Sequence, residues 1–239
     1  MPLALVDGRA IFFAHVPKTG GTAVEDYLIR RFGPLAILDR NKRTGVTGTG
    51  LITPATHLAA VDLQELLPPL DYSFAMVRDP VARMLSEYRY QSKVSRTTRL
   101  DFSTWLRVML ACLAREPRIY ENHIRPQSDL IPEGAEIFHL ERDGMAAMVA
   151  RLDAVTGTTA PDVTVTEVNR SKERRAEVRL TRQDVAAIED AQAEDYARFG
   201  FERRGVEDLP DDPRAAAREA LAAALAPVIV ARQRRRWLR

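Results

Sequence analysis

Residues 11–22 read IFFAHVPKTGGT, an apolar run that stops at Pro17 and opens into a short polar loop. The apolar residues predict a buried β-strand, and the pattern of residues 22–32 predicts a helix that Gly33-Pro34 ends. A tight loop between a strand and the N-terminus of a helix is a site for phosphate or sulfate. Its glycines let the backbone approach the anion, and Lys18 adds a positive charge. The segment therefore predicts the 5′ end of a nucleotide site.

The order of residues in this loop differs from the Gly-x-x-x-x-Gly-Lys-Ser/Thr loop of ATP- and GTP-binding proteins, because the lysine here precedes both glycines. That order argues against a kinase or GTPase. The loop resembles the 5′-phosphosulfate loop of sulfotransferases that use 3′-phosphoadenosine 5′-phosphosulfate (PAPS). In the carbohydrate branch of that family the loop reads His-x-Pro-Lys-Thr-Gly-Gly-Thr, and residues 15–22 match it at each position. The resemblance implies that the 5′ side of the donor is bound by Lys18, Thr19, Gly20, Gly21, Thr22 and Ala23. An ordinary strand-to-helix turn is the alternative interpretation.

A second segment, residues 73–90, reads SFAMVRDPVARMLSEYRY. An apolar strand ends at Arg78, turns at an Asp-Pro pair and enters a helix. This resembles the family's 3′-phosphate motif, which implies that Arg78 and Ser86 bind the phosphate that distinguishes PAPS from other adenylates. A guanidinium suits this task because its donors match phosphate oxygens and it stays charged. The alternative is that Arg78 pairs with Asp79 or Glu87 and that Ser86 is solvated.

Strands that alternate with helices predict an α/β fold, a P-loop-like three-layer domain with a central parallel sheet flanked by helices. Besides the segments above, we expect a short strand at residues 35–38, a strand at 136–140 and one helix from Thr181 to about Phe199. The chain of 239 residues is 46% hydrophobic, and we expect a catalytic domain at 1–205 and a C-terminal helical basic extension at 206–239. The formal net charge of +2 predicts no nucleic-acid partner.

The ends of the chain give expectations about location and partners. Residues 1–6 lack the basic start of a signal peptide, and residues 220–231 are too short an apolar run to span a bilayer, so we expect a cytoplasmic protein. This differs from the membrane-anchored eukaryotic carbohydrate sulfotransferases and resembles compact bacterial members. The last helix, which Pro227 is expected to interrupt, ends in RQRRRWLR. A solvated tail with a packed front half is the favoured interpretation, and contact with a second subunit or a peripheral membrane contact are the alternatives. The single cysteine, Cys112, lies in an apolar helical run and predicts a buried thiol.

Sulfuryl transfer requires a charge at the leaving oxygen and a base for the acceptor proton. Lys18 is expected to supply the charge. His57 resembles the catalytic histidine of several carbohydrate sulfotransferases, and an imidazole can accept a proton near neutral pH. A carboxylate, Glu25 or Asp79, is the alternative base. His15 and His139 are expected to be structural.

Further residues are assigned by weaker patterns. The polar segment at 120–129 predicts acceptor-side contacts from His123, Arg125 and Gln127, with a structural role for the segment as the alternative. An Asn-x-Ser element in a late loop resembles the one that closes over the nucleotide in the family, which implies donor contacts from Asn169 and Ser171. A solvated basic loop is the alternative there. No His/Cys/Asp cluster has the spacing of metal ligands, and no metal is expected.

The resemblance implies PAPS as donor, 3′,5′-adenosine diphosphate as the leaving product and a hydroxyl of a carbohydrate as the acceptor. Two other functions stay open at this point. One is a P-loop nucleotide phosphotransferase, which the displaced lysine disfavours. The other is a non-catalytic nucleotide-binding protein, which only the basic segments support.

Overall fold

The computed structural model describes residues 1–38, 57–63, 67, 69–94, 100–166 and 178–237. The chain divides into two compact units. The first unit comprises Met1–Arg78 and Gln127–Glu173, and the second comprises Asp79–Pro126 and Arg174–Arg239. The segments predicted at the 5′ and 3′ ends of the nucleotide therefore begin in the first unit, and the second of them continues into the second unit.

The first unit opens with a hairpin that the sequence analysis did not predict. Strand β1 (Leu3–Val6) pairs antiparallel with β2 (Arg9–Ala14), and Asp7 and Gly8 form the turn with φ angles of 48° and 80°. Asp-Gly between two apolar runs is a strong signal for a two-residue hairpin turn, so the sequence did contain the information. The expected short strand at 35–38 is wrong, since only an isolated bridge forms there, between Leu3 and Ala36.

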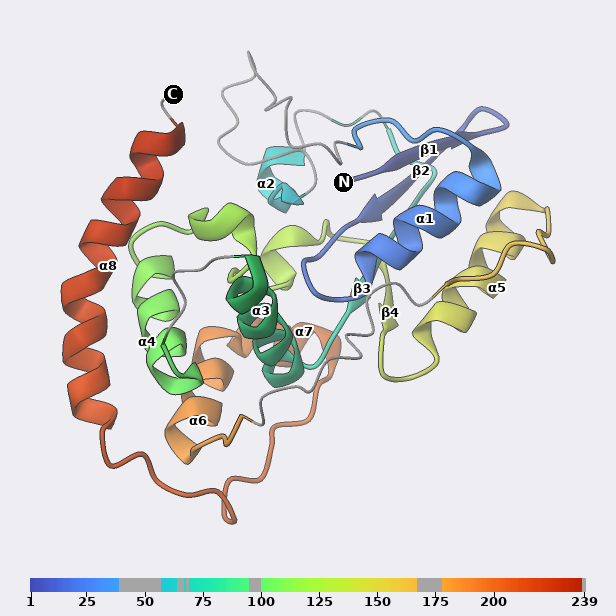
Figure 1. The fold of residues 1–239 in the computed structure, drawn as a ribbon. Coiled ribbons are helices and arrows are strands. Elements are labelled where there is room, and N and C mark those ends of the chain that lie inside the picture. The colour runs from blue at the N-terminus through green and yellow to red at the C-terminus, as the bar shows by residue number, and fades with distance from the viewer. Residues whose placement is uncertain (39–56, 64–66, 68, 95–99, 167–177, 238–239) are drawn as a thin grey trace. The chain divides into compact units, whose positions relative to one another are not determined.

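The rest of the sheet is parallel, in the order β1-β2-β3-β4 (Figure 1). Strand β3 (Tyr72–Val77) pairs with β2, and β4 (Glu136–His139) pairs with β3. Parallel pairing places the carboxyl ends of β2, β3 and β4 along one edge of the sheet. The loop that carries Lys18 follows β2, Arg78 follows β3, and Glu141 lies just beyond β4, so all three leave at this edge.

Both faces of the sheet are buried. Helices α1 (Gly21–Phe32) and α5 (Gly144–Thr156) pack on one face through a cluster whose buried members include Ile11, Phe13, Val24, Leu28, Phe74, Met76, Phe138, Met148 and Leu152. The side chains that alternate with these strand residues, Phe12, Ala75 and Val77, are also inaccessible to solvent. A sheet buried on both faces is typical of parallel α/β folds. The predicted three-layer α/β class is confirmed. The unit also contains the short helix α2 (Ala60–Leu63).

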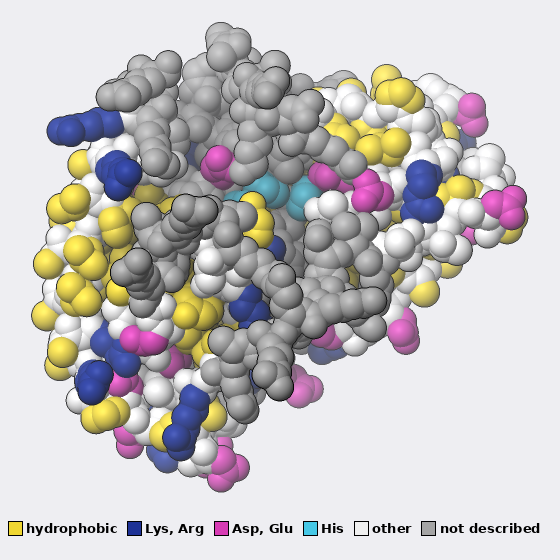
Figure 2. All heavy atoms as spheres, in the orientation of Figure 1, with side chains coloured by type: hydrophobic (Ala, Val, Ile, Leu, Met, Phe, Trp, Pro, Cys, Tyr) yellow, Lys and Arg dark blue, Asp and Glu magenta, His cyan; other side chains and the backbone are white. Residues whose placement is uncertain are grey.

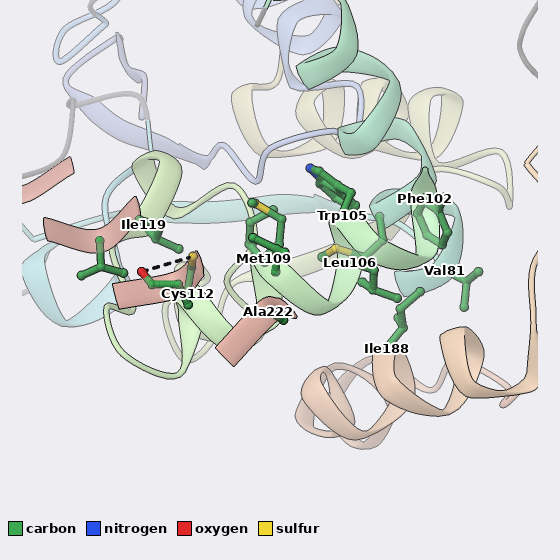
Figure 3. Close-up of a cluster of buried hydrophobic side chains, with 14 of the residues drawn as sticks. Val81, Phe102, Trp105, Leu106, Met109, Cys112, Ile119, Ile188 and Ala222 are labelled. Carbon is green, nitrogen blue, oxygen red and sulfur yellow. Dashed lines mark hydrogen bonds between the residues drawn. The ribbon is translucent and has the colours of Figure 1, made fainter. Parts of the chain in front are cut away.

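The second unit is helical. It contains α3 (Pro80–Val94), α4 (Phe102–Leu113), α6 (Arg182–Ala191), α7 (Ala193–Phe199) and α8 (Ala215–Trp237). Figure 3 shows its apolar core, in which Trp105, Leu106, Met109 and Ile188 are buried. Cys112 also lies there, with its thiol directed at the carbonyl oxygen of Ala226 at 4.0 Å. Burial raises the pKa of the Cys112 thiol to about 11, so the structure confirms the prediction of a buried thiol.

The helix expected from Thr181 to Phe199 is divided at Gln192 into α6 and α7. Its predicted start is confirmed, because Thr181 and Asp184 form a reciprocal capping box. Its predicted end is also confirmed, because Gly200 adopts the left-handed conformation with φ 63°. The break coincides with the use of the Gln192 side chain in the interior, where it bonds Arg83 and the Ile124 carbonyl.

Helix α8 packs against α4 with Ala222, Ala226 and Val230, which recur every fourth residue and are buried. The expected interruption at Pro227 is wrong, since α8 continues through that residue. Hydrophobic side chains also stay exposed along this helix (Figure 2), among them Leu221 and Val228. No described helix combines the length and apolarity needed to cross a bilayer. The predicted division at residues 205 and 206 differs from the two units and stays a prediction.

Substituting Ala226 tests whether α8 is part of the packed second unit. Ala226→Leu should lower the free energy of unfolding by about 1–3 kcal/mol, because the added carbons have no space beside α4. Ala223→Leu is the matched control, since Ala223 is exposed on the same helix. Urea unfolding measures both variants. Equal stability of the two variants would contradict the tight packing of α8.

Candidate functional site

The loop between β2 and α1 has an unusual backbone. Lys18 adopts φ 70° and Gly20 adopts φ 87°, both in the left-handed region. Thr19 is fully buried, and its hydroxyl donates to the Val16 carbonyl at 2.9 Å, which closes the loop on itself. Because that hydroxyl is already engaged inside the loop, Thr19 can serve an anion only through its backbone.

Helix α1 begins without a side-chain cap, since Gly20 occupies the N-cap position. An α-helix cannot satisfy its first N–H groups by itself, and its N-terminus carries a partial positive charge. The Ala23 amide donates to the Gly20 carbonyl at 2.9 Å, whereas Thr22 exposes its side chain beside the start of the helix. The arrangement therefore suits an anion as the cap of α1.

Packing accounts for Gly21, and the left-handed backbone accounts for Gly20. A Cβ on Gly21 would lie 2.2 Å from the imidazole ring of His15, and one on Gly20 would lie 2.7 Å from the Met145 side chain. Close approach of an anion is the reason that the sequence suggests for both glycines. The structure adds a reason from the protein side, because His15 fills the space directly behind Gly21.

His15 connects three parts of the first unit. Its Nδ1 lies 2.5 Å from Oε1 of Glu25 on α1, and both side chains are buried. Its backbone carbonyl lies 3.4 Å from Nδ1 of His57, and the two rings meet edge to face with centroids 4.8 Å apart. A carbonyl oxygen only accepts, so this contact requires the proton of a neutral His57 on Nδ1 and leaves the lone pair on Nε2.

These contacts bear on the alternative bases. Glu25 is 3% exposed and holds His15, whereas Asp79 accepts from the Ala82 amide at 2.7 Å and pairs with Arg204 at 2.8 Å. Each carboxylate is thus engaged in a local structural contact. His57 is also buried and in contact with His15, and its role as the base stays a prediction.

Arg78 extends from the end of β3 toward the loop. Its Nη1 donates to the Lys18 carbonyl at 3.3 Å, and its Nε donates to Oε1 of Glu141 at 3.2 Å. The structure therefore brings Arg78 and the Lys18 backbone together, because the two residues follow neighbouring parallel strands. It also shows that the partner of Arg78 is Glu141 and neither Asp79 nor Glu87.

Gln127 lies against the backbone of Arg78. Its Oε1 accepts from the Arg78 amide at 3.0 Å, and its Nε2 donates to the Arg78 carbonyl at 2.8 Å. The side chain is completely buried. Gln127 was predicted to contact the acceptor, but these two hydrogen bonds join it to the residue predicted to bind the donor.

Ser86, His123 and Arg125 belong to the second unit. Ser86 is half-buried on α3. The Nδ1 of His123 lies 2.9 Å from Oε2 of Glu87, and its ring stacks on Tyr90 with centroids 5.7 Å apart. His123 is therefore a buried, paired residue, which fits the structural alternative as well as an acceptor contact.

The backbone next to His123 is held by Arg83. This guanidinium is fully buried and donates to the carbonyls of His123 and Arg125, at 3.1 and 2.6 Å. Burial lowers the pKa of Arg83. The nearby carboxylates of Asp195 and Glu87 act in the opposite direction, but the effect of burial is larger. The preceding residues Tyr120, Glu121 and Asn122 have φ angles of 50°, 57° and 67°. Successive left-handed residues are costly and persist only where surrounding contacts hold them.

Some predicted residues cannot be compared with the structure, and some relevant residues were missed. Asn169 and Ser171 lie outside the described residues. Glu141 was not assigned any role, although its place just after a predicted strand was a usable signal, since parallel strands end at one edge. The pairings of Glu25 and Glu87 with histidines have no signal in the local sequence.

Charged side chains of both signs lie on the surface of the described residues. Figure 2 shows Lys and Arg side chains interspersed with Asp and Glu on the face in view. Within the described ranges, no group of three or more His, Cys, Asp and Glu side chains is arranged to hold a metal ion. The two cations predicted to bind the donor, Lys18 and Arg78, both follow strands that end at one edge of the sheet.

Known proteins resemble this chain at the level of a family. The model described as "Sulfotransferase family" matches residues 3–202. That range runs from β1 to just beyond α7 and ends before α8. Neither the curated proteins nor the solved structures contain a match to the chain.

Gly21→Ala tests the packing of His15 beneath the loop. The added Cβ should force the loop or the ring to move, with a loss of about 1–3 kcal/mol in the free energy of unfolding. Gly205→Ala is the control, because a Cβ there meets only the flexible end of Glu207. Urea unfolding of Gly21→Ala, His15→Ala and the double variant measures the coupling. Strictly additive losses would contradict the steric explanation.

Proposed function

Because the chain belongs to the sulfotransferase family, we propose that it transfers a sulfuryl group from PAPS to a hydroxyl group of a carbohydrate. The family supports sulfuryl transfer in general, and the donor and acceptor are the proposal. One observation carries it: Arg78 donates to the Lys18 carbonyl, so that two residues suited to anions share one edge of the sheet. PAPS is a donor with phosphate groups at both its 5′ and 3′ positions, and two adjacent anion sites match it.

The residues of the loop fit the 5′ end of PAPS. The first turn of α1 offers backbone N–H groups and a partial positive charge, and no side chain occupies its N-cap position. Lys18 contributes a full charge, Thr22 contributes an exposed hydroxyl, and Gly20 and Gly21 keep the approach open. Thr19 and Ala23 would act through the backbone.

Arg78 fits the 3′-phosphate. Its guanidinium is partly exposed and presents several donors in one plane. Ser86 is the proposed second contact to this phosphate, and Asn169 and Ser171 are proposed to close over the nucleotide. Discrimination against nucleotides that lack a 3′-phosphate would follow from Arg78.

PAPS supplies an activated sulfuryl group whose bond to the 5′-phosphate breaks as the acceptor oxygen bonds to sulfur. Lys18 would stabilise the negative charge that develops on the leaving phosphate, and 3′,5′-adenosine diphosphate is the product. The loop amides would hold that phosphate in line with the acceptor. Charge stabilisation and positioning therefore account for the role of the loop.

His57 is the proposed base. Its Nδ1 faces the His15 carbonyl, and Nε2 is the nitrogen proposed to take the proton of the acceptor hydroxyl. Glu25 would hold His15, and His15 would in turn support both the loop and His57. The acceptor is assigned to the carbohydrates by the branch that the loop resembles, and His123 and Arg125 are proposed to contact it.

Ligand binding and transfer together test this function. The protein should melt at a higher temperature with 3′,5′-adenosine diphosphate but not with ATP and Mg²⁺, because a ligand bound only by the native state stabilises it. Labelled PAPS with carbohydrate, lipid, alcohol and amine acceptors then identifies the product, and Lys18→Ala should abolish transfer with normal melting. An equal response to ATP would favour a phosphotransferase. Binding without transfer to any acceptor would favour a non-catalytic nucleotide-binding protein.

His57→Ala should lower kcat by roughly two to four decades, since general-base catalysis contributes about that much. Affinity for 3′,5′-adenosine diphosphate should stay within a few fold of wild type, because the imidazole is not proposed to touch the nucleotide. His139→Ala, a half-buried histidine at the end of β4, is the control and should leave kcat nearly unchanged. Turnover of His57→Ala above a tenth of the wild-type rate would transfer the role to another group, with Glu25 the next to test.

A further inference from the structure

Arg78 lies just past the end of the hydrogen-bonded ladder of β3. The last paired residues are Val77 on β3 and His139 on β4, and the Leu140 amide closes the ladder by donating to the Val77 carbonyl at 2.9 Å. At Arg78 the carboxamide of Gln127 replaces a neighbouring strand as the hydrogen-bond partner of the backbone. It accepts from the Arg78 amide and donates to the Arg78 carbonyl, as the N–H and C=O of an opposite residue in an antiparallel ladder would.

A primary amide is well suited to this task among the side chains. It has an acceptor and a donor in one plane, which match one N–H and one C=O of a peptide backbone. A carboxylate of the same shape could not donate to the carbonyl, and an aliphatic side chain could do neither. Gln127 is fully buried, so solvent does not replace the lost bonds when it is changed.

The position of the Arg78 backbone determines where its guanidinium lies. From that backbone the side chain reaches the Lys18 carbonyl on one side and the Glu141 carboxylate on the other. Arg78 is only partly buried, and its pairing with Glu141 involves an exposed carboxylate, which contributes little constraint by itself. The two buried hydrogen bonds between Gln127 and the Arg78 backbone restrain Arg78 more strongly.

We propose that Gln127 is a positioning residue for the donor, which fixes Arg78 at the end of β3 so that its guanidinium meets the 3′-phosphate. The inference rests on the proposed function, because it takes the 3′-phosphate as the ligand of Arg78. It reassigns Gln127 from the acceptor to the donor. Gln127 acts through Arg78 and does not itself touch the nucleotide.

The test compares two nucleotides that differ in the 3′-phosphate. Calorimetry on Gln127→Leu should show roughly a tenfold loss of affinity for 3′,5′-adenosine diphosphate and less than a threefold change for adenosine 5′-monophosphate. Steady-state kinetics should show a higher KM for PAPS with the KM for the acceptor unchanged. Gln127→Glu retains the shape but cannot donate to the Arg78 carbonyl, and it should give the same selective loss. Its result decides the question if the leucine variant folds poorly.

Two controls separate positioning from general damage. Gln183 accepts from the Asp212 amide at 2.8 Å in the second unit, and Gln183→Leu should leave the ratio of the two nucleotide affinities unchanged. Arg78→Ala combined with Gln127→Leu should bind 3′,5′-adenosine diphosphate no more weakly than Arg78→Ala alone, because Gln127 acts through Arg78.

Failure of the inference is distinguishable from failure of the proposed function. Wild-type protein that does not bind 3′,5′-adenosine diphosphate would overturn the function itself. Wild-type binding, together with Gln127 variants that lose both nucleotides equally or that raise only the KM for the acceptor, would overturn the role of Gln127. Additive losses in the double variant would do the same.

Discussion

Parallel pairing of β2, β3 and β4 is the constraint on which the candidate site depends. The register sets Ala14 opposite Ala75 and Val77 opposite His139, so that the chain leaves each of the three strands at the same edge. The strands themselves are apolar and buried, which confines polar groups to the segments that follow them. Residues far apart in the sequence therefore meet where the ladder ends. The loop that carries Lys18, the Arg78 side chain and its partner Glu141 meet because of this one geometry.

Buried polar groups then hold the edge in place. The pair of His15 and Glu25 packs against the loop at Gly21, and the Gln127 carboxamide binds the end of β3 at Arg78. Such groups are costly to bury and are tolerated when their hydrogen bonds are made. An isolated loop with the same residues would present the same charges without a fixed direction. The buried residues of the first unit thus determine the orientation of the loop with Lys18 and of the strand end with Arg78.

The sequence predicted what is local and missed what is tertiary. The loop, the helix after it, the Arg78 strand end and the Thr181 cap were predictable because neighbouring residues carry the signal. The contacts of Arg78 with Gln127 and Glu141 join residues 49 and 63 positions apart, and no local pattern reports them. The β1 hairpin is different, since its Asp-Gly turn is a local signal that predicts a hairpin. Pro227 shows the reverse, because packing of α8 on α4 overrides a local helix breaker.

The burial of Cys112 has a practical consequence for spectroscopy. It is the single cysteine of the chain, and with a pKa of about 11 almost none of its thiol is ionised at neutral pH. Only the thiolate attacks maleimides and related reagents. A cysteine introduced at an exposed position would therefore carry a fluorophore or spin label selectively, with the native thiol left in place. The wild-type chain already serves as the unlabelled background.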